Sequence, residues 1–344
     1  MTSLKNEIIE FSIDKISRAH SLLEKSKFRP FRYLNKELDS ELTTFWTASI
    51  LNNLNLTDSF GLGAEQDGKI VGLLTISCNP WESNVLGTNS AVINTFVVDN
   101  GIPNQLQIAS AILDRAINQA NTKGIEFIQC KSYTDDTTTI HALEKNGFLL
   151  TDTVVDCAYD YRRVPLEHII RPIIEKAITI REANLDDHDQ LVYVAGHSFN
   201  DHFGRFHSDE KIGRKLATKV YEQWICSSLD GYADKIHVAE IDQRIVGFSI
   251  WKFPTPLERN LKVRVGHYSI AGILPAFHKH GLFTALTYAG MESLEDFAEI
   301  IEGPTHINNY GVQRGYEKLH WRVLCDARHT FHKWLTTSKR FAPL

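Results

Sequence analysis

One succession of sequence patterns occurs twice in this chain of 344 residues, and this repetition restricts the fold more than any other feature. In each half, β-branched runs precede a helical pattern, a further strand pattern, a second helical pattern and a final strand pattern. A repeated succession of elements is typical of a duplicated unit. A single hydrophobic core also tends to split in chains longer than about 250 residues. The sequence therefore predicts two domains of one kind in tandem.

The patterns can be placed on the chain by their hydrophobic period. The first half shows three strands, a helix, a strand, a helix and a strand, over residues 61–65, 69–78, 91–98, 104–121, 125–131, 138–146 and 148–161. The second half shows a strand, two helices, three strands, a helix, a strand, a helix and a strand, over residues 177–182, 185–199, 209–229, 236–241, 245–253, 263–275, 281–297, 299–306, 308–319 and 321–335.

The segment 162–177 separates these two series. It begins with charged residues and contains Pro165 and Pro172, and charges with prolines between two strand-rich regions are typical of a linker. We therefore predict one domain over residues 1–165 and a second over residues 166–344.

Composition excludes several classes of function. A net charge of -5 lacks the basic excess of nucleic-acid-binding proteins. The five cysteines are an odd number without a C-x-x-C pair, which argues against a disulfide framework or a zinc knuckle. No apolar run is long enough for a signal peptide or a membrane span. We expect a cytoplasmic protein without nucleic-acid or membrane partners. His329 and His332 would point to opposite faces of one strand, so no metal site is predicted.

The stretch from Asn309 to Trp321 carries the clearest motif. Its sequence NYGVQRGYEKLHW resembles the pattern N-x-x-A-x-x-x-Y-E-K-x-G-F of acetyltransferases of the GNAT superfamily, although His320 and Trp321 replace its final Gly-Phe. This resemblance implies an α+β fold of three layers, in which a mixed and mostly antiparallel central sheet is flanked by helices. With the repeated order of elements, it implies two GNAT folds in tandem.

A second motif precedes the helical pattern at 281–297. The stretch from Ile273 to Phe283 resembles the family loop R/Q-x-x-G-x-G/A, with Gly281 in place and Phe283 instead of the second small residue. In the family this loop binds the pyrophosphate of acetyl-CoA with backbone N–H groups at a helix start, where the helix dipole favours an anion. The resemblance therefore assigns acetyl-CoA as the co-substrate, bound by Ile273, Leu274, Pro275, His278, Lys279, His280, Gly281, Leu282, Phe283, Asn309 and Gln313.

The same resemblance implies roles in the reaction. Asn309 would bind the pantetheine arm, and Tyr316 would protonate the departing thiolate while a primary amine attacks the thioester directly. The other interpretation is that Tyr316 is an ordinary aromatic residue of an amphipathic helix and Asn309 its N-cap. The proton of the amine needs an acceptor, and His306 is the first candidate because it precedes the motif. His267 and Glu240 remain open.

A narrower resemblance concerns the acceptor. Residues around Arg205, Phe206 and Trp224 resemble dTDP-fucosamine acetyltransferase-like enzymes, which acetylate a nucleotide-linked amino sugar. Arg205 would then pair with a diphosphate, and Phe206, Tyr221 or Trp224 would stack on a base or sugar. Core aromatics and a surface arginine are the equal alternative. A carrier-protein acyltransferase or decarboxylase and a non-catalytic acyl-CoA-binding module also remain open, as does a homodimer.

The first half lacks the residues that carry this chemistry. Leu143 stands at the tyrosine position, Asp136 at the asparagine position and Gln107 at the position of Gly281. A side chain at the last position would crowd the approach of a phosphate. We therefore predict a degenerate N-terminal domain and a catalytic C-terminal domain.

Overall fold

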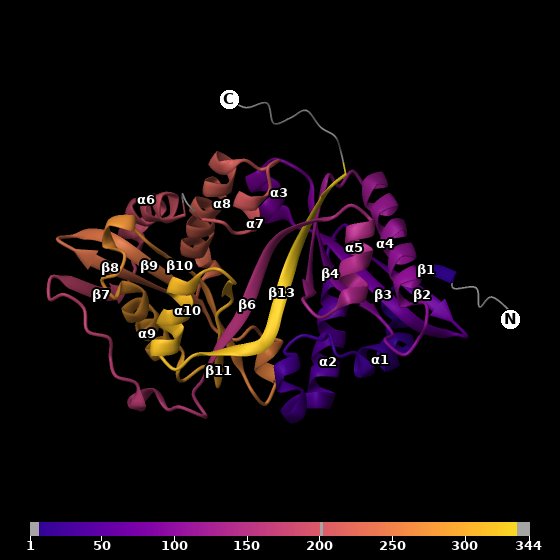
Figure 1. Cartoon of the computed structure of the whole chain (residues 1–344), viewed down its shortest axis with the longest axis horizontal. Coiled ribbons are helices and arrows are strands. Elements are labelled where there is room, and N and C mark those ends of the chain that lie inside the picture. The colour runs from indigo at the N-terminus through magenta and orange to yellow at the C-terminus, as the bar shows by residue number, and fades with distance from the viewer. Residues whose placement is uncertain (1–6, 200–201, 336–344) are drawn as a thin grey trace. The chain divides into compact units, whose positions relative to one another are not determined.

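The computed structural model describes residues 7–199 and 202–335, which form two compact units (Figure 1). Unit 1 comprises 7–152 and 328–335 of these residues, and unit 2 comprises the described residues between 153 and 327. This division differs from the predicted boundary at 165/166 in two places, because the strands β6 (Leu149–Asp160) and β13 (Arg322–Trp334) each contribute residues to both units.

Unit 1 is built on a mixed sheet in the order β1-β2-β3-β4-β5-β13. Only β4 and β5 run parallel, and the other neighbours are antiparallel. The end of β13 belongs to this unit because Arg328–Trp334 pairs with β5 from Tyr133 to Phe127. The remaining strands are β1 (Glu7–Phe11), β2 (Phe60–Gln66), β3 (Lys69–Cys78), β4 (Ser90–Val98) and β5 (Phe127–Tyr133).

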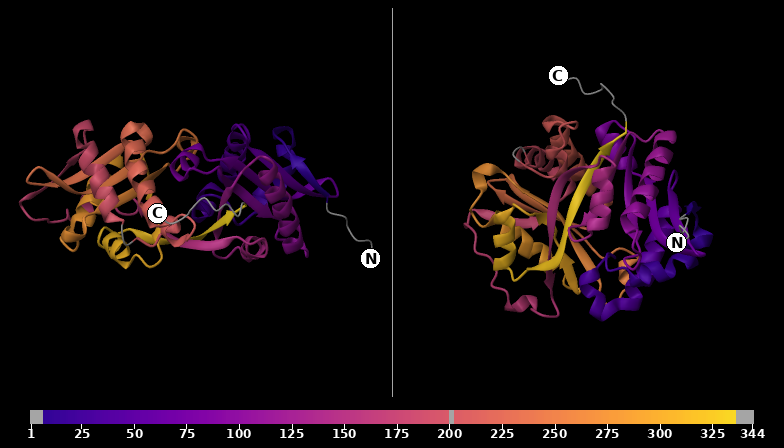
Figure 2. Two further views of the ribbon diagram at one scale, coloured as in Figure 1. Left: turned by 90° about the horizontal axis from the view of Figure 1, so that it is seen from above. Right: turned by 45° about the vertical axis from the view of Figure 1, so that its right-hand side comes forward.

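Helices cover both faces of this sheet (Figures 1 and 2). Adjacent residues of a strand point to opposite faces, so Leu73 packs with α1 and α2 while Leu74 packs with α4 and α5. The short helix α3 follows β3 and was not predicted from the sequence. The bounds are α1 (Ile16–Lys25), α2 (Asn35–Leu54), α3 (Pro80–Leu86), α4 (Gln105–Thr122) and α5 (Thr137–Lys145).

Unit 2 repeats this design. Its sheet has the order β6-β11-β10-β9-β8-β7, with β12 also paired to β6, and only β10 and β11 run parallel. The turn between β8 and β9 uses positive φ angles of 47° at Asp242 and 63° at Gln243. The strands are β7 (Ile178–Glu182), β8 (Lys235–Ile241), β9 (Arg244–Lys252), β10 (Val265–Ile273), β11 (Ile300–Glu302) and β12 (Thr305–His306).

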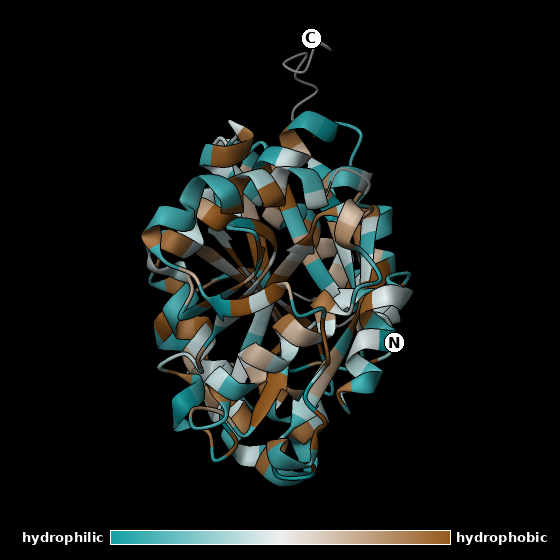
Figure 3. Cartoon of the chain, turned by 90° about the vertical axis from the view of Figure 1, so that its left-hand side faces the viewer, coloured by the Kyte–Doolittle hydropathy of each residue, from teal (hydrophilic) through white to brown (hydrophobic). Residues whose placement is uncertain are grey.

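The two faces of the second sheet are also separated by alternation. Ile250 packs with α6 and α8, whereas Trp251 packs with α9 and α10. The helices carry both hydrophilic and hydrophobic residues (Figure 3), as expected for helices with one face on a core. Their bounds are α6 (His188–Ser198), α7 (Arg205–Ser208), α8 (Arg214–Ser227), α9 (Leu282–Leu294) and α10 (Tyr310–Lys318). Over the part of the chain that the structure describes, no helix is long and apolar enough to cross a membrane.

Candidate functional site

In unit 2, the parallel pairing of β10 with β11 extends over three residue pairs. The ladder between β10 and β11 runs from Val265 and Ile300 to His267 and Glu302. Beyond it β10 continues to Ile273, paired only with β9, and carries a bulge between Tyr268 and Ile270. This edge of β10 therefore offers backbone N–H and C=O groups to a ligand that extends along the strand.

Unit 1 has the corresponding feature. Its parallel ladder ends at Ile93 and Cys130, although β4 extends to Val98. The bulge of β4 follows at once, because Thr75 pairs with Thr95 and Ile76 with Ile93. Both units therefore keep a bulged strand whose edge becomes open where the parallel neighbour ends.

The loop after β10 leads into the N-terminus of α9. It contains a single 3₁₀ turn, Pro275–Phe277, and then two residues with positive φ, 71° at Lys279 and 77° at Gly281. Gly281 is the N-cap of α9, and Leu282 is buried in the core. The first N–H groups of a helix lack partners within the helix, so the backbone at Gly281, Leu282 and Phe283 can receive an anion.

Basic side chains flank this loop. Lys279 is exposed, and one ring nitrogen of His278 lies 3.0 Å from the carbonyl oxygen of Ile273. Nδ1 of His280 lies 2.8 Å from a carboxylate oxygen of Glu175. Lys279 therefore gives the loop an exposed positive charge, whereas the carboxylate of Glu175 lies next to His280.

Two polar side chains at the start of α10, those of Asn309 and Gln313, form hydrogen bonds with nearby backbone groups. Oδ1 of Asn309 accepts the N–H of Val312 at 3.3 Å, which makes Asn309 the N-cap of α10. Nε2 of Gln313 donates to the carbonyl oxygen of Ile307 at 2.8 Å. The N-cap interpretation of Asn309 is thus correct for this structure, and a role for either side chain in binding a ligand stays a prediction.

Tyr316 lies in an aromatic cluster on the α9 face of the sheet. Its side chain is 4% exposed and stacks on Trp321 with ring centroids 4.4 Å apart. Burial, with Tyr268 and Cys157 nearby, raises the pKa of its hydroxyl. The hydroxyl is therefore protonated at neutral pH, which is the state that a proton donor requires.

A cavity of about 390 Å³ adjoins this cluster. Burial raises the pKa of the Cys157 thiol in its wall to about 12, so the thiol is not a nucleophile at neutral pH. The cavity is lined by Cys157, Tyr310, Gln313, Arg314, Tyr316, Glu317, Trp321, Arg322 and Val323.

His306 ends β12 beside residues of the loop that precedes α7. The ring of Phe203 lies edge-on to it at 4.4 Å, and Phe203 is 43% exposed. Nδ1 of His306 lies 3.0 Å from the backbone N–H of Asn308 and accepts it. Burial lowers the pKa of the neighbouring His202 to about 4, helped by His207 and His306. These rings form an aromatic and imidazole surface around His306, and neither Phe203 nor His202 was singled out from the sequence.

His267 occupies the last paired position of β10. Its Nε2 lies 2.9 Å from Oε1 of Glu258, and its Nδ1 lies 3.9 Å from Oε2 of Glu302. Burial lowers the pKa of His267, but these carboxylates outweigh it and the pKa is raised. Neither glutamate was predicted as a site residue. Glu258 lies in a stretch without a recognisable motif, and Glu302 lies in a predicted strand that carries no motif at that position.

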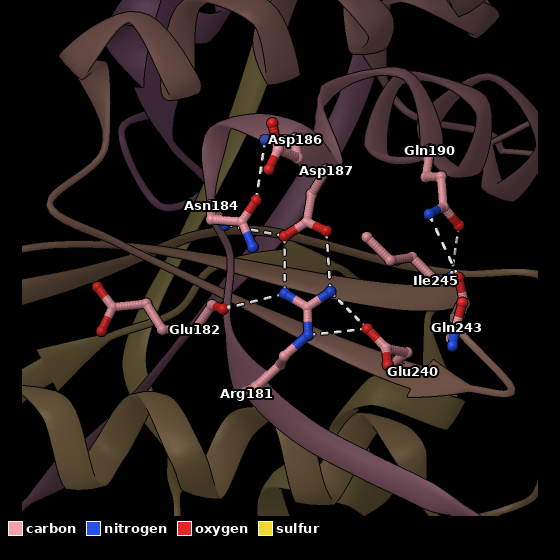
Figure 4. Close-up of polar contacts among 9 residues, drawn as sticks. All are labelled: Arg181, Glu182, Asn184, Asp186, Asp187, Gln190, Glu240, Gln243 and Ile245. Atoms are coloured by element: carbon pink, nitrogen blue, oxygen red, sulfur yellow. Dashed lines mark hydrogen bonds and ion pairs between the residues drawn. The ribbon is translucent and has the colours of Figure 1, made fainter.

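Glu240, another candidate proton acceptor, lies in an ion-pair network instead (Figure 4). Arg181 donates to both oxygens of Asp187 at 2.7 and 2.8 Å, and its Nε donates to Glu240 at 2.8 Å. Asp187 also accepts the N–H of Asn184 at 2.8 Å. The guanidinium holds Glu240 at the start of α6, so the carboxylate serves to join β7 and β8 to this helix.

The predicted acceptor residues lie on α7 and α8. Phe206 is 1% exposed and belongs to the core, so in this structure its ring has no face for stacking on a ligand. The guanidinium of Arg205 lies 4.3 Å from the centre of that ring, and Trp224 is half-buried. Within the described residues, no group of three or more His, Cys, Asp or Glu side chains could hold a metal ion.

Comparison with known proteins identifies the fold of the chain and a family match within its first half. Residues 22–148 match the acetyltransferase (GNAT) family. A tandem GNAT protein of the clavulanic acid biosynthesis pathway superposes with a TM-score of 0.58 at 12% identity, covering 97% of this chain and all of that one. The chain has the fold of a tandem GNAT protein. The predicted fold class is confirmed, and the family matched by residues 22–148 is one of acyltransferases, which generally use acetyl-CoA.

Two further similarities accompany this assignment. A GCN5-related N-acetyltransferase of Sphaerobacter thermophilus superposes with a TM-score of 0.64 at 12% identity, and the match covers 97% of both chains. An N-alpha-acetyltransferase of Sulfurisphaera tokodaii is 24% identical over 163 residues, which are 45% of this chain and 87% of that protein. The family match at 22–148 falls on the half that was predicted to be non-catalytic.

Proposed function

We propose that unit 2 transfers an acetyl group from acetyl-CoA to a primary amine by direct attack on the thioester. The observation that carries this proposal is the open edge of β10, bounded by the N-terminus of α9 at one end and by His267 at the other. The pyrophosphate would bind the backbone at Gly281 with Lys279 beside it. The pantetheine arm would extend along β10, which brings the thioester to the bulge after Tyr268.

Backbone N–H groups at the bulge would polarise the thioester carbonyl, as in an oxyanion hole. The amine nitrogen forms a bond to the carbonyl carbon, and the C–S bond breaks with its electron pair on sulfur. Tyr316 would then give its proton to the thiolate, since its hydroxyl is held protonated by burial. The aromatic surface at Phe203 and His306 would border the acceptor.

The acceptor is proposed to be a small molecule with a primary amine. A nucleotide-linked amino sugar remains one candidate, with Arg205 as the diphosphate contact, although Phe206 is too buried to stack on its base. The relation to an N-alpha-acetyltransferase adds peptides with a free N-terminus to the candidates.

A coenzyme A release assay over a panel of amines tests the activity. The panel contains dTDP-amino sugars, polyamines, amino acids, lysine peptides and peptides with a free N-terminus. We expect Tyr316→Phe to lower kcat about 100-fold without changing the Kd of acetyl-CoA. Tyr193→Phe is the matched control, because Tyr193 is exposed on α6, and it should behave as wild type.

Other outcomes of the same assay favour the alternatives. Release of coenzyme A only with a phosphopantetheine carrier protein, and without an amine, would indicate a carrier-protein acyltransferase or decarboxylase. Binding of acetyl-CoA without turnover of any member of the panel would indicate a non-catalytic acyl-CoA-binding module.

Unit 1 is a second candidate for the acetyl-CoA site. The family match at 22–148 and the bulge of β4 both favour it. Asn104→Asp would add a negative charge at the N-cap of α4 and keep a good capping residue. Lys279→Glu replaces a positive by a negative charge in the loop before α9 of unit 2. If only Lys279→Glu weakens acetyl-CoA binding in calorimetry, unit 2 is the site, and the reverse result assigns unit 1.

A further inference from the structure

The hydrogen bonds of two histidines fix which ring nitrogen of each carries a lone pair. A neutral imidazole has one N–H and one lone pair. Nε2 of His267 faces Oε1 of Glu258 at 2.9 Å, and an ionised carboxylate can only accept. Nε2 therefore carries the hydrogen, and the lone pair of His267 lies on Nδ1.

In His306, by contrast, the lone pair on Nδ1 already accepts a hydrogen bond. Its Nδ1 accepts the backbone N–H of Asn308 at 3.0 Å. The lone pair of the neutral ring is thus already engaged, and the other nitrogen, Nε2, carries the hydrogen. His306 can donate a hydrogen bond to an acceptor molecule, but it can take a proton only by giving up the bond to Asn308.

Position also favours His267. It is the last residue of β10 that is paired with β11, opposite Glu302, and the bulge begins at the next residue. The side chain of His267 is 27% exposed, so a ligand can reach the ring. Glu302 lies 3.9 Å from Nδ1, which is an ion-pair distance but too long for a hydrogen bond.

Glu258 holds the ring in this orientation. Its side chain is only 9% exposed, and Oε2 accepts the N–H of Thr255 at 2.7 Å. The hydrogen bond from His267 and its positive charge help to hold the pKa of Glu258 below its usual range against the effect of burial. A buried carboxylate with its own fixed donor is a suitable partner for orienting an imidazole.

We propose that Nδ1 of His267 accepts the proton of the acceptor amine, that Glu258 is its positioning residue, and that His306 contributes a hydrogen-bond donor. This inference rests on the proposed transfer of an acetyl group by unit 2. The amine N–H bond breaks as the N–C bond forms, and the proton goes to Nδ1. The C–S bond breaks, sulfur takes the proton of Tyr316, and His267 returns its proton through solvent to the tyrosinate. No other reactant is needed.

The charges around His267 set the expected pH dependence. Glu258 and Glu302 favour its protonated form, while Lys252 and burial oppose it. Because only the neutral ring can accept a proton, kcat should rise with pH through the pKa of His267. Removing the charge of Glu258 should move this inflection to lower pH.

The test compares four variants with wild type, using benzylamine and spermidine as acceptors together with the best amine of the panel. His267→Gln should lower kcat about 100-fold, abolish the inflection and leave the Kd of acetyl-CoA unchanged. Glu258→Gln should shift the inflection to lower pH, and Glu258→Asp should restore part of the wild-type profile. His306→Gln should lower kcat and keep the inflection.

Two measurements guard against effects of folding. His237→Gln is the matched control, since His237 is buried on β8 and bonds Oγ of Ser293; it should leave kcat and the inflection unchanged. Nitrogen-15 NMR titration of wild type and Glu258→Gln should show a lower pKa of His267 in the variant, independently of turnover.

Failures of the two proposals look different. Turnover that keeps its rate and its inflection in His267→Gln, or loses the inflection in His306→Gln, contradicts the inference and leaves the transferase intact. A wild-type protein that binds acetyl-CoA and acetylates no amine contradicts both.

Discussion

Gly303 lies so close to the ring of Tyr316 that a Cβ atom at Gly303 would overlap the tyrosine hydroxyl, and it would also come 2.8 Å from Cζ3 of Trp321. The absence of a side chain at Gly303, just beyond β11, therefore permits the position of the proposed proton donor. The backbone just beyond β11 thus helps to determine where the hydroxyl of Tyr316 lies.

Gly303→Ala should displace the ring of Tyr316. Because a shift of about 1 Å at a reacting group can cost about 100-fold in rate, we expect kcat to fall by that order. The free energy of unfolding should decrease by about 1–3 kcal/mol, as for other overpacked cores. Steady-state kinetics and urea denaturation measure the two effects. An unchanged kcat with a clear loss of stability would show that catalysis does not depend on the position of Tyr316.

Two further glycines, Gly311 and Gly315, test the packing of α10 on α9. A Cβ at Gly315 would come 2.6 Å from Cε1 of Phe283, whereas a Cβ at Gly311 would meet only Oδ1 of Asn309 at 3.8 Å. Both glycines lie on α10. Gly315→Ala should lower the free energy of unfolding by about 1–3 kcal/mol, while Gly311→Ala should leave it unchanged or raise it by up to about 1 kcal/mol.

Thermal and urea denaturation of these two variants provide the comparison. The same substitution on the same helix then differs only in what the new methyl group meets. Equal stabilities would show that Phe283 can move away without cost, and that this contact does not fix α10.

From residue 61 onward the sequence predicted most of the local elements, because their periodicity reflects which face is buried. The helix expected at 104–121 is α4 (Gln105–Thr122), and the strand expected at 245–253 is β9 (Arg244–Lys252). The pattern at 321–335 predicted β13 as a strand but not its partner. Phe331 pairs with Cys130, and no local pattern specifies a neighbour so distant in the chain.

The site shows the same limit. The positive φ at Gly281 was foreseeable from a glycine before a helix, and the motif located Tyr316. The link between His267 and Glu258 was not foreseeable, because it depends on how the turn Glu258–Asn260 returns the chain to β10. The sequence left open whether Phe206 stacks on a ligand or belongs to the core, because the four residues of α7 carry too little periodicity to decide. In the structure Phe206 lies in the core.

Glu175 offers a test of the phosphate loop. Its carboxylate lies 2.8 Å from Nδ1 of His280, and both side chains are largely exposed. A negative charge near the loop opposes a bound pyrophosphate, so Glu175→Gln should lower the Kd of acetyl-CoA by about two- to fivefold at low salt, and the gain should fade as salt screens the charge. Isothermal titration calorimetry at two ionic strengths measures it.

Glu167→Gln is the control, since Glu167 is exposed and pairs with His168 in the same linker. It should leave the Kd unchanged. If Glu175→Gln has no effect at either ionic strength, the pyrophosphate does not bind at this loop of unit 2.

The network of Arg181 should make folding dependent on acidic pH. Hydrogen bonds from Arg181 lower the pKa of Asp187 in the folded state, against the opposing effect of burial. A carboxyl group with a depressed pKa stabilises the fold above its unfolded pKa, which is about 3.9. This contribution is lost as the pH falls through the lower folded value.

Arg181→Met should therefore lower the free energy of unfolding by about 1–2 kcal/mol near pH 7, because Asp187 and Glu240 would lose their shared donor. The difference from wild type should shrink below about pH 4, as Asp187 becomes protonated first in the unfolded chain and then in the folded protein. Urea denaturation from pH 3 to pH 7 measures this difference. Arg171→Met is the matched control, since Arg171 and Glu292 form an exposed pair, and its effect should stay within about 0.5 kcal/mol at every pH. A constant difference across the range for Arg181→Met would mean that the arginine stabilises α6 by packing and not through the charge of Asp187.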